Sequence, residues 1–238
     1  MKERPIIFSA PMVRAILEGR KTQTRRVVKW RDVPNGLDLG FSGLSAREYP
    51  KGWVLESGSR LSSEWRCAPT RCPYGAPGDR LWVREAWAAG KCADGFKPSM
   101  LHPGTWLVDN GGLWFPADNA RPRNPISPRG KTRPGMFMPR WASRILLEIT
   151  SVRVERIQDI SEADAQAEGI VSRRIGTGDA RTGCRDAFGL ACDDSVWASS
   201  TIQAYGALWE SINGPDSWSA NPWVWVVEFK IVMLEPKP

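Results

Sequence analysis

The sequence predicts a mixed α+β fold: one small β-barrel with flanking helices and long irregular insertions. Segments with the apolar pattern of strands lie far apart in the chain, and stretches rich in glycine, serine and proline separate them. The chain has 238 residues, of which 42% are hydrophobic, and is therefore long enough for one good core. Because no internal repeat or linker is apparent, we expect a single domain over residues 1–238, with insertions near residues 30–77, 88–140 and 171–194.

The first three expected elements follow closely on one another. Residues 4–9 contain an apolar run that is typical of a short buried strand. A short helix comes next, because apolar residues recur at helical spacing over residues 12–17. Pro11 suits its first turn, and Gly19 suits the left-handed residue that follows a helix. Residues 23–29 then alternate as a strand does, so neighbouring side chains are expected on opposite faces.

Turn and cap residues signal the later elements. We expect strands over residues 80–87, 144–156 and 223–233, and helices from Ser161 to Glu168 and from about Ser195 to Ile212. Ser161 and Asp164 form a capping box, and Gly169 ends that helix. Glu168 therefore falls in its last turn. The longer helix is expected to bury Ile202, Tyr205, Leu208, Trp209 and Ile212.

The balance of charged and aromatic residues favours an anionic partner. The formal net charge is +7, and nucleic acid is the commonest anionic partner of a basic protein of this kind. Thirteen tryptophans outnumber the seven phenylalanines and three tyrosines together. An exposed indole can stack on a base, which contributes about 1–3 kcal/mol per base. The alternative for most of the tryptophans is that they fill the core.

The sequence indicates neither membrane association nor a metal site. The chain contains no apolar run of about 18 residues and no secretory signal at its start, so we expect a cytoplasmic protein without membrane association. Five cysteines at irregular spacing, with a single histidine and no CxxC pair, favour reduced thiols over disulfides or a zinc site. No cofactor or metal is expected.

Residues 121–140 are basic and interrupted by prolines. The segment has no acidic residue, and its cations are Arg121, Arg123, Arg129, Lys131, Arg133 and Arg140. Five prolines favour an extended chain over a helix. Two interpretations remain open: an arm that contacts phosphates through these cations, or a solvated loop.

One segment carries a resemblance to a known family. Residues 19–26, Gly-Arg-Lys-Thr-Gln-Thr-Arg-Arg, resemble the signature turn of ASCH domains, a Gly-x-Lys-x-x-(Glu or Thr)-x-Arg pattern that follows the first helix. Three further pieces resemble the family in the expected order, at residues 78–79, 165–168 and 224–230. The resemblance implies a PUA-like barrel, and the whole chain looks like the longer ASCH-like proteins of phages and prophages.

The resemblance also implies a site. With threonine at position 24, the motif is similar to the family's bacterial amidohydrolases, which deacetylate N4-acetylcytidine; their catalytic set maps to Lys21, Thr24 and Glu168. Thr24 would attack the acyl carbon, Lys21 would activate its hydroxyl, and Glu168 would transfer the proton. Arg26 would stabilise negative charge or anchor the substrate. Further substrate contacts are expected from Gly19, Arg25, Arg84 and Glu85.

Two alternatives to this amidohydrolase stay open. The same pocket and the basic segment could bind RNA or modified DNA without chemistry, through Arg121, Arg123, Arg129, Lys131 and Arg133. The second alternative is a metal-dependent ribonuclease, with Glu85 and Glu148 approaching each other across adjacent strands. A nucleoside or a single-stranded nucleic acid is the expected partner in each case.

Overall fold

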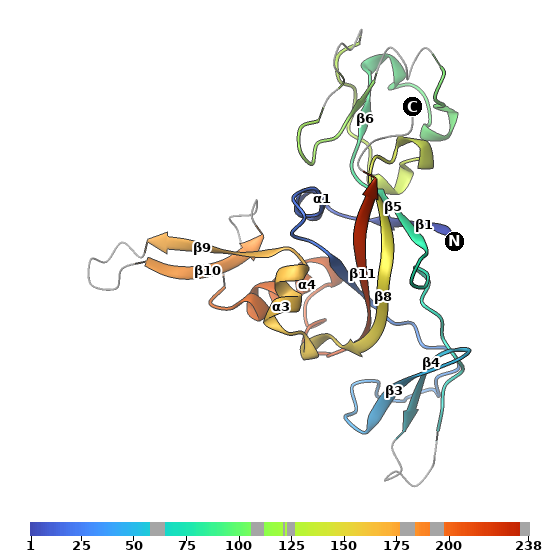
Figure 1. Cartoon of the computed structure of the whole chain (residues 1–238), viewed down its shortest axis with the longest axis vertical. Helices are drawn as coiled ribbons and strands as arrows, with labels where there is room; N and C mark the ends of the chain where they lie inside the picture. Colours follow the sequence, from blue (N-terminus) through green and yellow to red (C-terminus); the bar gives the residue numbers. More distant parts are fainter. Residues whose placement is uncertain are drawn as a thin grey trace. The chain divides into compact units, whose positions relative to one another are not determined.

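A computed structural model describes residues 1–57, 65–105, 112–120, 122, 127–176, 184–190 and 198–233 (Figure 1). Over these ranges the fold is mixed α+β and mostly sheet, which confirms the expected class. The helices are α1 (Ala10–Leu17), α3 (Glu162–Ala167) and α4 (Thr201–Asn213). None of the described helices is long and apolar enough to cross a membrane.

The largest sheet has five strands. Their order is β1 (Glu3–Ile7), β5 (Arg80–Arg84), β8 (Leu146–Arg156), β11 (Trp223–Met233) and β2 (Gln23–Val27). Strand β1 is parallel to β5, whereas the pairs β5–β8 and β11–β2 are antiparallel. Because the order runs from one edge strand to another, the described residues form an open sheet and no closed barrel.

The chain divides into two compact units. The first unit contains residues 1–21, 78–149 and 229–238, and the second contains residues 22–77 and 150–228. Each is assembled from segments that are distant in sequence, and two of the four unit boundaries fall within β8 and β11. The single ASCH-like domain expected from the sequence stays a prediction.

The opening of the first unit follows its sequence signals closely. Strand β1 pairs with β5 in a register that places Ile6 opposite Val83, and both side chains are buried. Helix α1 buries Val13 and Ile16 and has a proline in its first turn, as expected. Gly19 follows the helix at φ +72°, a conformation that glycine adopts without steric cost.

Two helices in the second unit pack on one hydrophobic core. The core includes Ala165 of α3, Tyr205 and Trp209 of α4, and Val224 and Val226 of β11. As the capping box predicts, the Ser161 side chain accepts a hydrogen bond from the Asp164 N–H at 3.1 Å, and Gly169 follows α3 with a positive φ.

The expected bounds and buried face of the longer helix are wrong in part. Helix α4 begins at Thr201 instead of near Ser195, because the Ser200 side chain caps it by accepting from the Gln203 N–H at 3.2 Å. Ile212 was expected in the core but is 50% exposed. The core cluster takes no α4 residue beyond Trp209, so the last turn of the helix has no apolar partner there.

The segments expected to be irregular insertions contain short sheets. These are β3 (Leu44–Tyr49) with β4 (Gly52–Ser57), β6 (Ala88–Ala89) with β7 (Leu113–Trp114), and β9 (Ile170–Gly176) with β10 (Cys184–Leu190), each an antiparallel pair. Single 3-10 turns cover Lys91–Ala93, Pro98–Met100, Gly135–Phe137, Arg140–Ala142 and Ile157–Asp159. Strand β3 is half-exposed along most of its length, so its sequence lacks the apolar alternation that would have revealed it.

Candidate functional site

The motif residues of the expected catalytic set are buried. Lys21 is 1% exposed, and its Nζ lies 5.7 Å from the centroid of the Phe8 ring in the first unit. Thr24 of β2 and Glu168 at the end of α3, both in the second unit, are each 2% exposed. A substrate could reach the Thr24 hydroxyl only after local opening of the fold.

Two hydrogen bonds bring the start of β2 to the end of α3. The Thr22 backbone N–H donates to the Ala167 carbonyl at 2.9 Å, and the Gln23 side-chain amide donates to the Asp164 carbonyl at the same distance. Thr24 and Glu168 are therefore held in one small region of the second unit. Gly19 contributes a turn after α1, and no Cβ placed there would meet another atom.

Arg25, expected to contact substrate, is the centre of an ion-pair network that we call the Arg25 cluster. Its side chain is fully buried and contacts Glu155 at 2.6 Å, Asp164 at 3.3 Å and Glu168 at 3.3 Å. The guanidinium carbon also lies 5.9 Å from the centroid of the Tyr205 ring. All these partners are residues of the protein, so the Arg25 side chain has a structural role.

Burial and charge act in opposite directions on this cluster. Burial disfavours the charged guanidinium, but the carboxylates of Glu168 and Glu155 outweigh it and raise the pKa of Arg25 above its ordinary value. Burial, reinforced by the charge of Glu168, raises the pKa of the Tyr205 hydroxyl well above its usual range. The cluster therefore holds a buried, charged arginine among three acidic side chains.

Arg84 and Glu85, also expected at the substrate, have internal roles in the first unit. The Arg84 guanidinium carbon stacks 4.6 Å from the centroid of the Trp82 ring. Glu85 accepts two hydrogen bonds from Arg144 at 2.8 and 3.0 Å, and burial raises the pKa of its carboxyl despite that partner. Arg26 of β2 is half-buried.

The described residues provide no acidic metal site for the ribonuclease alternative. Glu148 is paired with Lys230 at 2.8 Å, whereas Glu85 is paired with Arg144, so the two carboxylates serve different cations. In the described ranges no three histidine, cysteine, aspartate or glutamate side chains are placed to hold a metal ion.

The basic segment is partly built into the first unit. Arg121 and Arg123 lie outside the described residues. Arg129 and Lys131 are exposed, as a phosphate contact requires. Arg133 is 4% exposed and donates to the carbonyls of Phe96 and Ala93 at 2.9 and 2.7 Å. Its donors are therefore used to fix a loop, which its charge in the sequence could not reveal.

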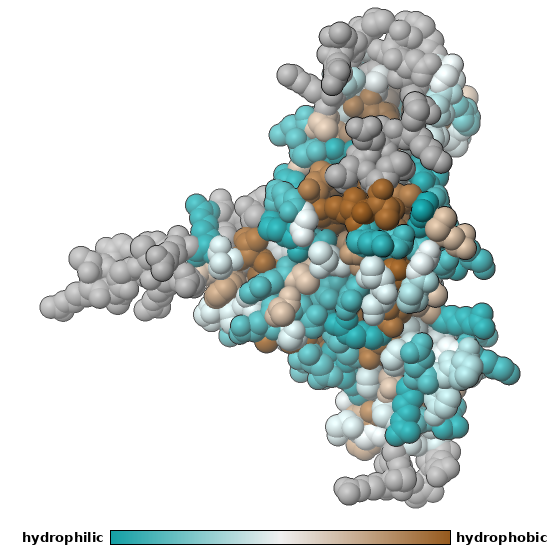
Figure 2. Space-filling model, viewed as in Figure 1, coloured by the Kyte–Doolittle hydropathy of each residue, from teal (hydrophilic) through white to brown (hydrophobic). Residues whose placement is uncertain are grey.

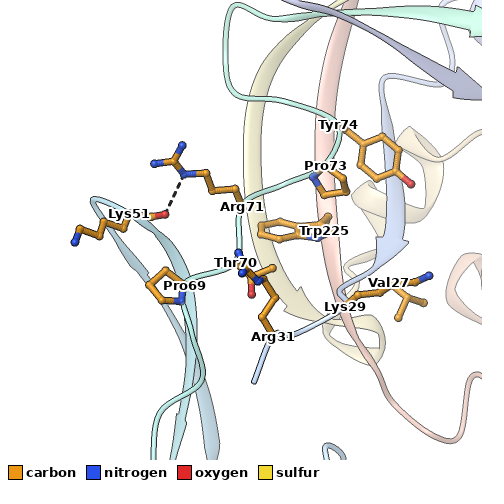
Figure 3. A pocket seen from close by; sticks show the side chains of 10 residues that line it. All are labelled: Val27, Lys29, Arg31, Lys51, Pro69, Thr70, Arg71, Pro73, Tyr74 and Trp225. Atoms are coloured by element: carbon orange, nitrogen blue, oxygen red, sulfur yellow. Dashed lines mark hydrogen bonds between the residues drawn. The ribbon is translucent and has the colours of Figure 1, made fainter. Parts of the chain in front are cut away.

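A basic cavity of about 880 Å³ lies in the second unit (Figure 3). Its lining residues are Val27, Lys29, Arg31, Lys51, Pro69, Thr70, Arg71, Pro73, Tyr74 and Trp225. Four of them are cations and none is acidic. Within the described part of the chain, none of these four cations forms a salt bridge. None of these lining residues was expected at a site.

Pairing between β4 and the chain after it builds one wall of the basic cavity. Trp53 and Thr70 exchange two backbone hydrogen bonds of 2.9 and 2.8 Å. Gly52, at φ +136°, permits this approach, because a Cβ there would lie 2.8 Å from the Thr70 oxygen. The Arg71 Nε donates to the Lys51 carbonyl at 3.1 Å, drawn as a dashed line in Figure 3. Lys51 and Arg71 are thereby held side by side.

Strands β2 and β11 provide the opposite part of the lining. Trp225 lies in the middle of the labelled side chains in Figure 3 and is 1% exposed, since it packs edge-on against Trp53 at 6.4 Å. Val27, opposite Val224 in the strand register, is 43% exposed. Tyr74 is half-buried and adds a second ring. The arrangement can hold an anion next to a planar apolar group.

The surroundings of the cavity are polar. The part of the surface that the β3–β4 hairpin occupies in Figure 2 is dominated by hydrophilic residues, teal in that view. The exposed cations Lys29, Arg31, Lys51 and Arg71 belong to this second unit. In the sequence these cations lie near proline and aromatic residues, but they are spread over more than forty positions. No compact motif therefore marks them as one site.

Comparison with known proteins adds no further constraint on the site. No family model, no curated protein and no solved structure matches this chain.

Proposed function

We propose that this chain binds a phosphorylated ligand with a planar base, a nucleotide or a single-stranded nucleic acid, in the basic cavity. The observation that carries the proposal is the set of four cations without carboxylate partners among the described residues, gathered around Trp225 and Tyr74. The formal net charge of +7 is consistent with an anionic ligand. A cytoplasmic location, where such ligands are abundant, is part of the proposal.

Size and chemistry support this assignment. Ligand sites commonly have volumes of about 300–1,000 Å³, and the basic cavity has about 880 Å³. Lysine and arginine bind phosphate oxygens through charge-assisted hydrogen bonds, and aromatic rings accept bases of any sequence. Because Trp225 is almost fully covered, Tyr74 is the ring available for stacking and Trp225 forms the floor.

Direct binding tests the proposal. Fluorescence anisotropy with a labelled oligothymidylate should give saturable binding that weakens with salt. Lys51→Glu combined with Arg71→Glu should reduce the affinity at least tenfold, because both cations line the cavity.

The matched control is Lys91→Glu combined with Lys97→Glu, an equal change of charge at two exposed lysines of the first unit. Equal losses in the two double variants would mean that general charge, and not the cavity, attracts the ligand. Unchanged binding in Lys51→Glu/Arg71→Glu would also reject the cavity as the site.

A second proposal is the amidohydrolase of the ASCH type, with its PUA-like barrel and with Lys21, Thr24 and Glu168 as the catalytic set. It is supported by the hydrogen bonds that hold the start of β2 at the end of α3 and by the 3.3 Å contact of Arg25 with Glu168. Release of cytidine from N4-acetylcytidine, lost in Thr24→Ala and in Lys21→Ala, is the expected result. Turnover that persists in both variants would exclude this set.

A further inference from the structure

A second, more apolar cavity adjoins the basic cavity. It has a volume of about 420 Å³ and is lined by Tyr49, Pro50, Lys51, Val54, Arg66, Cys67 and Pro69. Lys51 and Pro69 line both cavities, so the two lie side by side at the turn between β3 and β4. A ligand in the basic cavity can therefore extend into the apolar cavity past the Lys51 side chain.

Apart from Lys51, the polar side chains that line the apolar cavity have partners within the protein. The Arg66 Nε is bound to Glu56 at 2.8 Å, and its Nη2 donates to the Tyr49 hydroxyl at 2.8 Å. The Cys67 sulfur accepts from the Leu55 N–H at 3.1 Å, and burial raises the pKa of this thiol. With these groups engaged, the remaining lining offers apolar surface to a ligand.

The Tyr49 ring forms a fixed wall of this cavity. Its hydroxyl donates to a Glu56 oxygen at 3.2 Å, and the Arg66 guanidinium carbon lies 5.3 Å from the ring centroid. These contacts hold the ring in one orientation before a ligand arrives. A planar apolar group can use such a pre-ordered wall without the entropic cost of ordering it.

We infer that the two cavities hold successive nucleotides of one single strand, with the second base in the apolar cavity and the linking phosphate at Lys51. This rests on the proposed function and names its ligand as a strand instead of a free nucleotide. The positions of the groups support it, because Lys51, one of the two shared residues, is a cation without a carboxylate partner among the described residues. An alternation of basic and apolar sites matches the alternation of phosphate and base along a strand.

Three probes test the inference by competition against a labelled oligothymidylate. They are thymidine 5′-monophosphate, thymidine 3′,5′-bisphosphate and the dinucleotide pTpT. The bisphosphate has a phosphate at the linking position but no second base. Its terminal phosphate carries at least as much negative charge as the diester of pTpT, so tighter binding of pTpT reports the second base. We expect pTpT to bind at least about fivefold more tightly than the bisphosphate, the lower end of what one stacked base contributes.

A variant at the rim of the apolar cavity provides the second measurement. Pro50 is exposed in the β3–β4 turn and lines only the apolar cavity, so Pro50→Trp should fill that cavity. The affinity for pTpT should then fall to that for the bisphosphate, while binding of the bisphosphate stays unchanged. Unchanged bisphosphate binding also verifies that the variant is folded. Pro50→Glu, which places a carboxylate beside Lys51, should weaken the binding of both pTpT and the bisphosphate.

The outcomes separate the two proposals. Equal affinities for pTpT and the bisphosphate in the wild-type protein would overturn the strand inference and leave the basic cavity as a nucleotide site. Preserved pTpT binding in both Pro50 variants would overturn it as well. Failure of all three probes and of the oligothymidylate to bind would reject the proposed function itself.

Discussion

The Arg25 cluster and the basic cavity lie in the same unit, and both contain arginine, but the surroundings of their arginines are opposite. Arg25 is fully buried and has carboxylate partners in Glu155, Asp164 and Glu168. The cavity cations, Arg71 among them, are exposed and have no such partners in the described ranges. An arginine whose charge is neutralised inside the protein stabilises the fold, whereas an unneutralised one is available to a ligand.

The largest expected effect separates the two regions by stability. Arg25→Met should lower the free energy of unfolding by about 3–5 kcal/mol, because it removes the guanidinium that the buried Glu168 carboxylate contacts at 3.3 Å. Urea denaturation measures this loss. Arg153→Met is the matched control, since Arg153 pairs with the same Glu155 and Asp164 but is 32% exposed, and it should cost about 1 kcal/mol or less. Equal costs for the two variants would contradict the structural role assigned to Arg25.

A smaller effect is expected on ligand affinity. Tyr74→Ala should weaken oligothymidylate binding by about 1–3 kcal/mol, because it removes the ring available for stacking. Tyr74→Phe keeps the ring and should bind nearly as well as the wild-type protein. Anisotropy titrations of both variants provide the measurement, and similar losses in the two would show that the hydroxyl matters instead of the ring.

The salt dependence of binding sharpens the contrast further. A strand that engages all four cavity cations should give a slope of about −3 in a plot of log K against log salt concentration, since each phosphate contact on a single strand contributes about −0.7. Arg71→Gln should reduce the magnitude of the slope by about 0.7. A slope that does not change in this variant would place the phosphates elsewhere.

The smallest expected effect is on the stability of the protein in acid. Burial tends to raise the pKa of Asp164, but the hydrogen bond from Ser161 and the charges of Arg25 and Arg153 outweigh it, so its pKa is lowered. A carboxylate with a lowered pKa stabilises the fold fully above its unfolded pKa of about 3.9, and that stability is lost as the pH falls toward the lowered value. Asp164→Asn should therefore lose less stability than the wild-type protein between pH 5 and pH 3, measured by urea midpoints. An identical pH profile in the two proteins would show that Asp164 does not contribute to the loss of stability in acid.

Elements with strong local signals could be predicted from the sequence. The last strand was expected over residues 223–233 and has those bounds, because a long apolar run between turn residues leaves few alternatives. The cap of α3 was also predicted correctly. The β3–β4 hairpin was missed, since its half-exposed strands show no regular alternation.

The candidate site was harder to predict, for a physical reason. The expected motif around Thr24 is defined by residue type and spacing, but spacing does not tell whether a side chain is buried, and Thr24 is 2% exposed. The basic cavity combines residues of β2, the β3–β4 turn, residues 69–74 and β11. Tertiary pairing alone brings these segments together, so no local pattern in the sequence marks them as one site.

The close approach of Gly52 to Thr70 imposes a constraint of its own. A Cβ at residue 52 would collide with the Thr70 oxygen, so any other amino acid at residue 52 would displace the chain at Thr70. Arg71 is the next residue along that displaced chain. A mutational scan should therefore show that substitutions at position 52 weaken ligand binding. Glycine has no side chain that could contact a ligand, so residue 52 determines specificity through the backbone alone.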